Sequence, residues 1–156
     1  MDIKYITPVE VAKIHDVLIQ YSGGLPGDGG SKCIDSVCHS AETYHSDQTL
    51  EGISSYYLSR IAKDHCFNDG NKRTAYLSSR YFLMLNGADF NGSDYDIAAD
   101  EIEAIAASKT MQEAYETAMG FTSKYIVTDQ LTIPDFHTFD RLVLKSLAVT
   151  SLLSDR

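Results

Sequence analysis

The side chains best suited to chemistry are concentrated in one short stretch, which begins at His65 and ends at Arg73. This stretch combines an imidazole, a carboxylate, amides, a glycine and two adjacent cations. An apolar segment with helical spacing follows directly and predicts a helix that runs to Leu85, with Asn86 and Gly87 as its C-cap. The polar cluster is therefore expected where a loop enters a helix.

The start of a helix is suited to binding phosphate, because its first N–H groups lack partners within the helix and the dipole is positive there. Lys72 and Arg73 add full charges, and Gly70 allows a tight turn. His65 is a candidate general base near neutral pH, and Asp69 is a candidate Mg²⁺ ligand. These residues predict a nucleoside triphosphate with Mg²⁺, beside a base that can deprotonate a hydroxyl.

The same residue types could equally form a solvated, capped helix start without any function. Their order favours a functional site, because it resembles the Fic/Doc family signature His-x-Phe-x-(Asp/Glu)-Gly-Asn-x-Arg at every fixed position. The Doc (death-on-curing) branch carries lysine before the arginine and Thr-Ala after it, as do Lys72, Thr74 and Ala75. Cys66 departs from the family, which commonly has proline there. Its thiol, next to the candidate base, is a further possible nucleophile.

The N-terminal region also resembles the Doc branch. Thr7 and Glu10 form a capping box, and the helix that it starts ends at Gly23-Gly24. His15 lies on this helix within an Ile-His-Asp sequence that recurs in the family, and taken alone it is interpreted as a structural or surface histidine. The glycine-rich segment 22–32 lacks the Lys-Ser/Thr end of a P-loop and is interpreted as a connector.

The resemblance implies a role for each residue of the signature. His65 would be the catalytic base, Asp69 would hold Mg²⁺ at the phosphates, and Arg73 would bind phosphate. Asn71 and the backbone near Gly70 would form an anion cradle. The side chain of the signature phenylalanine is also expected to be a core plug that fixes the loop. The residues predicted to contact the nucleotide are Phe67, Asn68, Asp69, Gly70, Asn71, Lys72 and Arg73.

The resemblance leaves two reactions open. Fic proteins mostly transfer AMP from ATP to a protein hydroxyl, whereas the lysine-bearing Doc branch resembles a kinase that presents the γ-phosphate. Lys72 favours the kinase, because a long cation fills one phosphate pocket, whereas Gly70 matches the Fic pattern. The prediction is a Doc-like toxin that uses ATP and Mg²⁺ to phosphorylate a Ser or Thr of a translation factor, with elongation factor Tu as the family's precedent. An antitoxin chain is the expected partner. AMP transfer and a non-catalytic binding module are the alternatives.

Composition bears on the partners, the location and the redox state expected of the protein. The chain of 156 residues has 13 Lys and Arg against 22 Asp and Glu, and its net charge of −9 argues against nucleic-acid binding and fits a basic partner. It contains no apolar run long enough for a membrane span and no signal-peptide core at its start. Cys33, Cys38 and Cys66 are an odd and sparse set, which predicts reduced thiols and a cytoplasmic protein.

Apolar spacing predicts an all-α fold, a single compact helical domain with the motif helix at its centre. Further helices are expected over 32–43 and 50–63, after Ser93, and from Thr110 to about residue 124. The polar segment 43–49 corresponds to a flap that, in the resembling family, pairs with an extended segment of the target. Its Tyr44 and His45 are candidate target contacts, with exposed loop residues as the alternative.

The predicted organisation is a Fic/Doc-like catalytic domain over 1–124 and a C-terminal helical extension over 125–156 that packs on the same domain. Pro134 interrupts this extension, and one amphipathic helix is expected after it, with Phe139, Leu142, Val143 and Leu147 on its apolar side. The extension is interpreted as a cover for the core, with a dimer or regulatory surface as the alternative.

Overall fold

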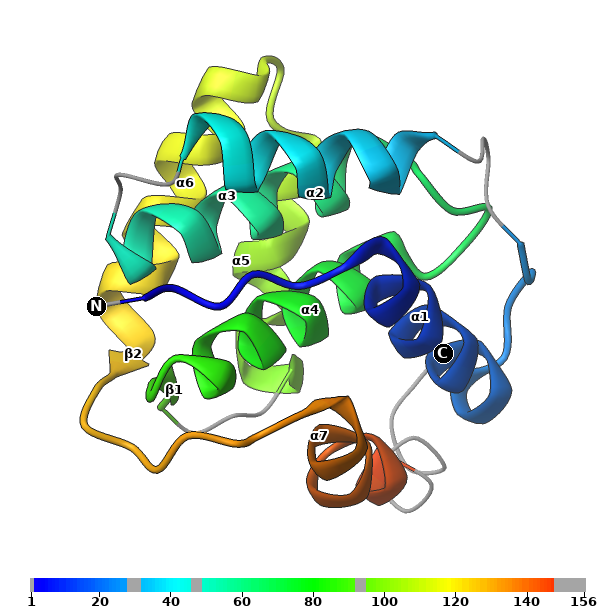
Figure 1. Ribbon diagram of the computed structural model, residues 1–156. Coiled ribbons are helices and arrows are strands. Elements are labelled where there is room, and N and C mark those ends of the chain that lie inside the picture. Colours follow the sequence, from blue (N-terminus) through cyan, green and yellow to red (C-terminus); the bar gives the residue numbers. More distant parts are fainter. Residues whose placement is uncertain (1, 28–31, 46–48, 92–94, 148–156) are drawn as a thin grey trace.

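The computed structural model describes residues 2–27, 32–45, 49–91 and 95–147, and it confirms the predicted all-α fold (Figure 1). The helices are α1 (Pro8–Ser22), α2 (Cys33–Tyr44), α3 (Leu50–Lys63), α4 (Asn71–Leu85), α5 (Tyr95–Ala107), α6 (Met111–Tyr125) and α7 (Phe136–Leu142), with a short 3-10 helix at Leu144–Ser146. Two short strands, β1 (Asp89–Phe90) and β2 (Ile126–Val127), pair antiparallel. Within the described residues no helix is long and apolar enough to cross a membrane.

The motif helix α4 lies at the centre of the fold, against α1, α3, α5 and β1 (Figure 1). Its contact with α3 is close because both helices place small residues there. Ser79 donates a hydrogen bond to the backbone carbonyl of Ser54 at 3.2 Å, and both side chains are fully buried. Large side chains of α4 fill the remaining core, with Tyr81, Phe82 and Leu83 at no more than 1% exposure. The start of α4 is therefore held on a rigid base.

The helix boundaries follow local capping signals. At the start of α1 both halves of the capping box form, since Thr7 Oγ1 accepts from the Glu10 N–H at 3.2 Å and the Glu10 carboxylate accepts from the Thr7 N–H at 2.9 Å. Thr110 and Glu113 have the same spacing at the start of α6, but there only one half of the capping box forms. Thr110 accepts from the Glu113 N–H, but the Glu113 carboxylate accepts from the N–H of Lys109 and not from that of Thr110. Ser93, after which a helix is predicted, lies outside the described residues, and α5 begins at Tyr95.

The C-terminal segment covers one end of α4. The Ile133 N–H donates to the Met84 carbonyl at 3.1 Å, and Phe139 packs on Tyr81 with 4.8 Å between ring centroids. Phe139 is fully buried, as its predicted apolar side requires. The prediction for Leu142 is wrong, because its side chain is 53% exposed. Helix α7 ends at that residue, and the 3-10 helix that follows turns Leu144 into the core instead.

The predicted flap is only partly within the described residues, since 46–48 lie outside them. Tyr44, at the end of α2, is 73% exposed, so its side chain is available to a partner. His45 is half-buried, and its ring lies against Tyr56 with 4.1 Å between centroids. These two candidate target contacts therefore differ: one projects into solvent, whereas the other packs on α3.

Candidate active site

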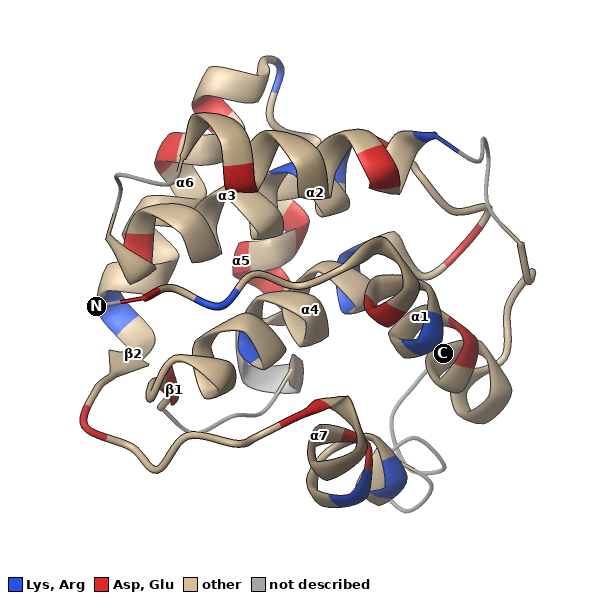
Figure 2. Ribbon diagram, in the orientation of Figure 1, with Lys and Arg blue, Asp and Glu red and all other residues tan. Residues whose placement is uncertain are grey.

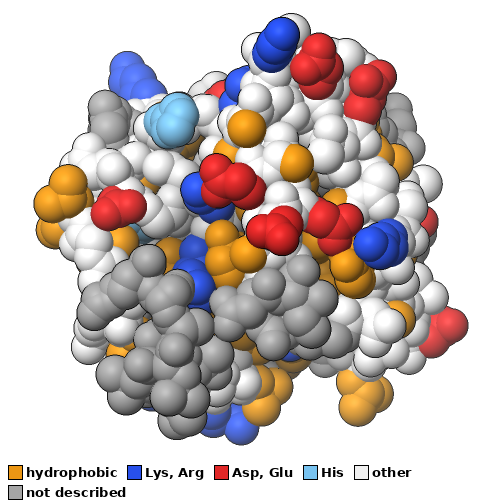
Figure 3. All heavy atoms as spheres, turned by 180° about the vertical axis from the view of Figure 1, so that it is seen from behind, with side chains coloured by type: hydrophobic (Ala, Val, Ile, Leu, Met, Phe, Trp, Pro, Cys, Tyr) orange, Lys and Arg blue, Asp and Glu red, His pale blue; other side chains and the backbone are white. Residues whose placement is uncertain are grey.

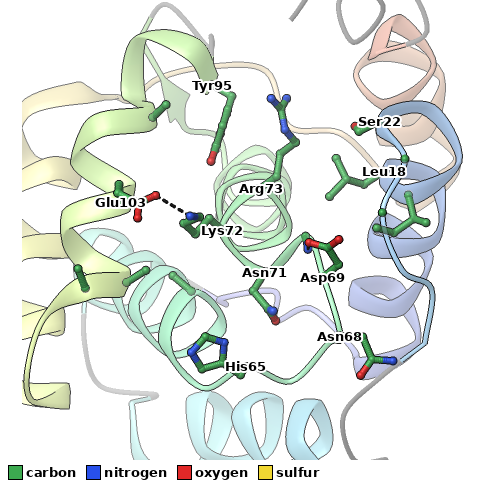
Figure 4. Close-up of a pocket in the computed structure, with 18 of the residues that line it drawn as sticks. Leu18, Ser22, His65, Asn68, Asp69, Asn71, Lys72, Arg73, Tyr95 and Glu103 are labelled. Atoms are coloured by element: carbon green, nitrogen blue, oxygen red, sulfur yellow. Dashed lines mark hydrogen bonds and ion pairs between the residues drawn. The ribbon is translucent and has the colours of Figure 1, made fainter. Parts of the chain in front are cut away.

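A cavity of about 780 Å³ opens where the start of α4 meets α1, α3 and α5 (Figure 4). Its walls come from the last turns of α1 and the following glycines, the end of α3, the loop into α4 and one face of α5. Figure 3 shows basic side chains set back in a hollow on one face of the molecule, with acidic side chains beside them. A cavity of this volume can enclose a small-molecule ligand.

Most of the predicted site residues line this cavity. They are His65, Asn68, Asp69, Gly70, Asn71, Lys72 and Arg73. The prediction that Phe67 also contacts the nucleotide is corrected, because its side chain is 6% exposed and lies outside the cavity lining. Its ring stacks on that of His15 with 4.0 Å between centroids, so it anchors the loop in the core.

His65 follows the C-cap of α3, Asp64, and leads the chain into the loop before α4. Its backbone has a φ of +53°, a left-handed conformation that is uncommon outside glycine and is often found at functional sites. The reversal at this residue exposes the imidazole at the cavity wall, near Asn71 in Figure 4, whereas the next residue, Cys66, is buried. The local backbone therefore places one ring where it can reach a ligand.

Asp69 is held through both its side chain and its backbone. Its Oδ1 accepts a hydrogen bond from the Gly70 N–H at 2.9 Å, and its Oδ2 accepts one from the Leu25 N–H at 3.3 Å. Its backbone carbonyl lies 2.7 Å from Nε2 of His15. Gly24 is needed beside it, because a Cβ atom there would stand 2.8 Å from Oδ2 and the residue has a φ of +111°. The carboxylate is thus oriented by the chain that leaves α1.

The glycine-rich loop after α1 is more than the connector that the sequence suggests. The Asn68 N–H donates to the Gly27 carbonyl at 3.1 Å, and the Asn68 side chain donates to the Pro26 carbonyl at 3.1 Å. The described part of this loop therefore binds the motif loop at two consecutive residues, Asn68 and Asp69. The sequence signal was its glycines, which indicate tight turns or close approach but do not identify what approaches.

The N-cap of α4 is Gly70, which has a left-handed φ of +77° and no side chain with which to cap the first turn. Asn71 closes the loop behind it. Its Oδ1 accepts from the Phe67 N–H at 3.0 Å, and its Nδ2 donates to the Phe67 carbonyl at 2.9 Å. An amide nitrogen has two hydrogens, so the hydrogen bond to the Phe67 carbonyl uses only one of the two donors of Asn71. Asn71 therefore holds the loop in shape while it lines the cavity.

The two cations of the first turn meet residues of α5. The Lys72 ammonium forms an ion pair with the Glu103 carboxylate at 2.5 Å, and the Arg73 guanidinium lies 4.2 Å from the centroid of the Tyr95 ring (Figure 4). Figure 2 shows that acidic residues are spread along α5, which faces this basic turn. Sequence reasoning missed Glu103 and Tyr95, because they are more than 20 residues from the motif and carry no local signal.

The structure also corrects the prediction of three reduced cysteines. Cys33, at the start of α2, and Cys66 form a disulfide with 5.3 Å between their Cα atoms, while Cys38 is free and buried. Cys66 is 1% exposed and covalently occupied, so it cannot serve as the nucleophile beside His65. The pairing depends on the packing of α2 against the motif loop, which the spacing of cysteines in the sequence does not reveal.

Comparison with known proteins agrees with the geometry. The model of the Fic/DOC family matches residues 5–83, which include α1, the cavity loop and most of α4. The chain is also similar to the protein kinase doc of Escherichia phage P1. The two sequences are 33% identical over 124 residues, a match that covers 74% of this chain and 98% of that protein.

Proposed function

The chain belongs to the Fic/DOC family, in its Doc branch, and we propose that it is a protein kinase that transfers the γ-phosphate of ATP to a serine or threonine hydroxyl. The observation that carries this proposal is that His65, Asp69, Lys72 and Arg73 all line the same cavity. A base, a carboxylate and two cations are the groups that phosphoryl transfer requires, because the protein mainly positions the reactants and stabilises charge.

The start of α4 is the proposed phosphate site. Its N–H groups and dipole favour an anion, Arg73 offers a planar fork for two phosphate oxygens, and Lys72 adds a point charge. The remaining cavity extends between α3 and α5, where Ala62, Ala99 and Ala106 form part of the wall. This apolar part of the cavity can accommodate the base and sugar of the nucleotide.

Asp69 is the proposed ligand for Mg²⁺. In the described part of the chain, no cluster of three or more His, Cys, Asp or Glu residues is arranged to hold a metal ion. Mg²⁺ commonly binds one or two carboxylates, the substrate phosphates and several waters, so a single carboxylate at a phosphate site fits its chemistry. Bound there, the ion would supply positive charge to the phosphates.

In the proposed reaction, His65 accepts the proton of the target hydroxyl, and the hydroxyl oxygen forms a bond to the γ-phosphorus. The bond between that phosphorus and the bridging oxygen to the β-phosphate breaks, and ADP leaves. Lys72 favours this outcome, because this long cation occupies the sequence position at which Fic proteins usually have a glycine that leaves room for phosphates beyond the one that is attacked. AMP transfer, in which the α-phosphorus is attacked and pyrophosphate leaves, is the alternative reaction.

We also propose that the protein is the toxin of a toxin–antitoxin pair, with a translation factor as its target. The support for this step is the Doc-type signature and the likeness to a protein whose name is protein kinase doc. An antitoxin with a basic segment would complement the net charge of −9, and that charge also disfavours nucleic acid as a partner.

The test is label transfer. Purified protein is mixed with Mg²⁺, bacterial lysate and ATP labelled at the α or the γ position, and the labelled protein is identified. We expect label from the γ position only, and we expect His65→Ala to abolish it. His137→Ala is the matched control, because His137 is exposed on α7 and outside the cavity lining. Label from the α position alone would establish AMP transfer, and transfer by His65→Ala would exclude His65 as the base.

A further inference from the structure

The buried side chain of His15, on α1, makes a hydrogen bond to the motif loop that α1 does not need for its own structure. The residue lies on the buried side of α1 with Val11, Ile14 and Leu18, and it is 1% exposed. A polar ring among apolar side chains is unfavourable unless its nitrogens have partners. The partner of Nε2 is the backbone carbonyl of Asp69, 54 residues further along the chain and 2.7 Å away.

This contact fixes the tautomer of the ring. A carbonyl oxygen can only accept a hydrogen bond, so Nε2 must carry the hydrogen and donate it to Asp69. The other nitrogen, Nδ1, lies 4.0 Å from Oδ1 of Asp16, which is beyond hydrogen-bonding distance, and the Asp16 side chain is 78% exposed. Asp69 is therefore the partner that accounts for burying this ring.

The same ring packs on a second residue of the motif loop and lies close to a third. Its face stacks on Phe67 with 4.0 Å between centroids and only 10° between the planes. Its Cδ2 atom stands 3.7 Å from the point that a Cβ atom on Gly70 would occupy. His15 thus packs on Phe67 and lies beside Gly70, the residues on either side of Asn68 and Asp69, and it holds the peptide from which the Asp69 carboxylate projects.

We infer that His15 is a positioning residue for Asp69: the hydrogen bond from Nε2 to the Asp69 carbonyl sets the direction of the carboxylate that would hold Mg²⁺. This inference rests on the proposed function and extends it to a residue outside the motif. Two independent restraints then act on Asp69, since Leu25 and Gly70 hold its carboxylate while His15 holds its backbone. Without the backbone restraint, only the two carboxylate contacts would hold Asp69, and the peptide from which its side chain projects would be free to shift relative to the phosphates.

Two substitutions separate the hydrogen bond from the packing. His15→Phe retains the stacked ring and removes the donor, whereas His15→Gln removes the ring and retains an N–H that can reach the same carbonyl. Groups that orient a metal ligand typically contribute about 10- to 100-fold to metal affinity. We expect His15→Phe to weaken Mg²⁺ binding by about 10-fold or more, and we expect His15→Gln to recover most of that loss.

The measurement is calorimetric titration of Mg²⁺ into protein saturated with a non-hydrolysable ATP analogue, with binding of the analogue in EDTA as the second readout. The expected result is weaker Mg²⁺ binding in His15→Phe, with metal-free analogue binding unchanged. His39→Phe is the control, because His39 is exposed on α2. Unchanged Mg²⁺ affinity in His15→Phe would overturn the inference. Equal losses in His15→Phe and His15→Gln, or an equal loss of metal-free binding, would reduce His15 to a packing residue.

A measurement on the unmodified protein covers the case in which His15→Phe does not fold. Long-range ¹H–¹⁵N NMR identifies the imidazole tautomer without any ligand, and the inference requires hydrogen on Nε2. Hydrogen on Nδ1 alone would overturn it. If the tautomer is as expected but the wild-type protein binds neither the analogue nor Mg²⁺, the proposed function fails, and the metal role of His15 fails with it.

Discussion

The disulfide between Cys33 and Cys66 gives the sharpest prediction for stability. It closes a loop of 33 residues, and chain-entropy arguments assign such a loop about 3.7 kcal/mol at 25 °C. For a domain of this size, each kcal/mol moves the melting temperature by about 2–4 °C. Cys33→Ser should therefore melt about 7–15 °C below the oxidised wild-type protein. Cys33 is the better site for substitution, because it is only partly buried, whereas Cys66 is 1% exposed.

The assay is thermal unfolding followed by circular dichroism, with and without dithiothreitol. Dithiothreitol should lower the melting temperature of the wild-type protein to that of Cys33→Ser and should leave the variant unchanged, so the variant controls for other effects of the reductant. Equal melting temperatures for the oxidised wild-type protein and the variant would refute the entropic reasoning. A shift of both proteins by dithiothreitol would show that the reductant acts elsewhere.

A thiol count tests the pairing directly. In the native protein no thiol should react quickly, because Cys38 is buried and burial raises the pKa of its thiol from 9.0 to about 12. Only thiolate reacts with disulfide reagents, so a raised pKa and low exposure both slow the reaction. Unfolding without reduction should expose one thiol per chain, and reduction should expose three. Three thiols before reduction would mean that Cys33 and Cys66 are not paired.

Two further substitutions test the cavity. Glu103→Gln releases Lys72 from an exposed ion pair worth about 0.2–1 kcal/mol, so a non-hydrolysable ATP analogue should bind up to about 5-fold more tightly by calorimetry. Weaker binding would mean that Glu103 itself contacts the ligand. Gly24→Ala places a Cβ atom 2.8 Å from the Asp69 carboxylate at a φ of +111°, and it should lower stability by about 1–3 kcal/mol and weaken Mg²⁺ binding. Its control is Gly120→Ala, an exposed helical position where the new Cβ would meet no atom within 4 Å apart from its chain neighbours and the backbone of α6 itself, and which should stabilise α6 by about 0.5–1 kcal/mol in urea unfolding. Equal metal affinity in Gly24→Ala and the wild-type protein would contradict the role assigned to Gly24.

Local signals were sufficient to predict the helices that build the site. The predicted span 50–63 of α3 agrees with the structure, and so does the end of α4 at Leu85. Capping residues and helical periodicity act within about four residues, so they can be recognised in the sequence without knowledge of the fold. The two-residue strands could not be predicted, because they have no such local signal. They exist only because Phe90 and Ile126 are brought together, and two residues show no periodicity.

The contacts that complete the site could not be predicted in the same way. The ion pair of Lys72 with Glu103 spans 31 residues, the disulfide spans 33, and the contact of His15 with Asp69 spans 54. Each depends on how a helix packs against another helix or against the motif loop, and many other acidic, cysteine or histidine positions were compatible with the sequence. The motif therefore identified the side chains that line the cavity. It did not identify the residues that position these side chains or pair with them.

The motif loop is restrained from three directions by residues that the family signature does not contain. His15 binds its backbone from α1, the carbonyls of Pro26 and Gly27 bind Asn68, and Cys33 binds its neighbour Cys66 covalently. These restraints act on the backbone of the loop, on the Asn68 side chain and on Cys66. They do not involve the imidazole or the cations of the motif, whose side chains line the cavity. Catalytic groups must be held within a fraction of an ångström to be effective. It follows that a chain could match the signature in full and still lack activity if these supporting contacts were lost, so the signature and its supports need to be tested separately.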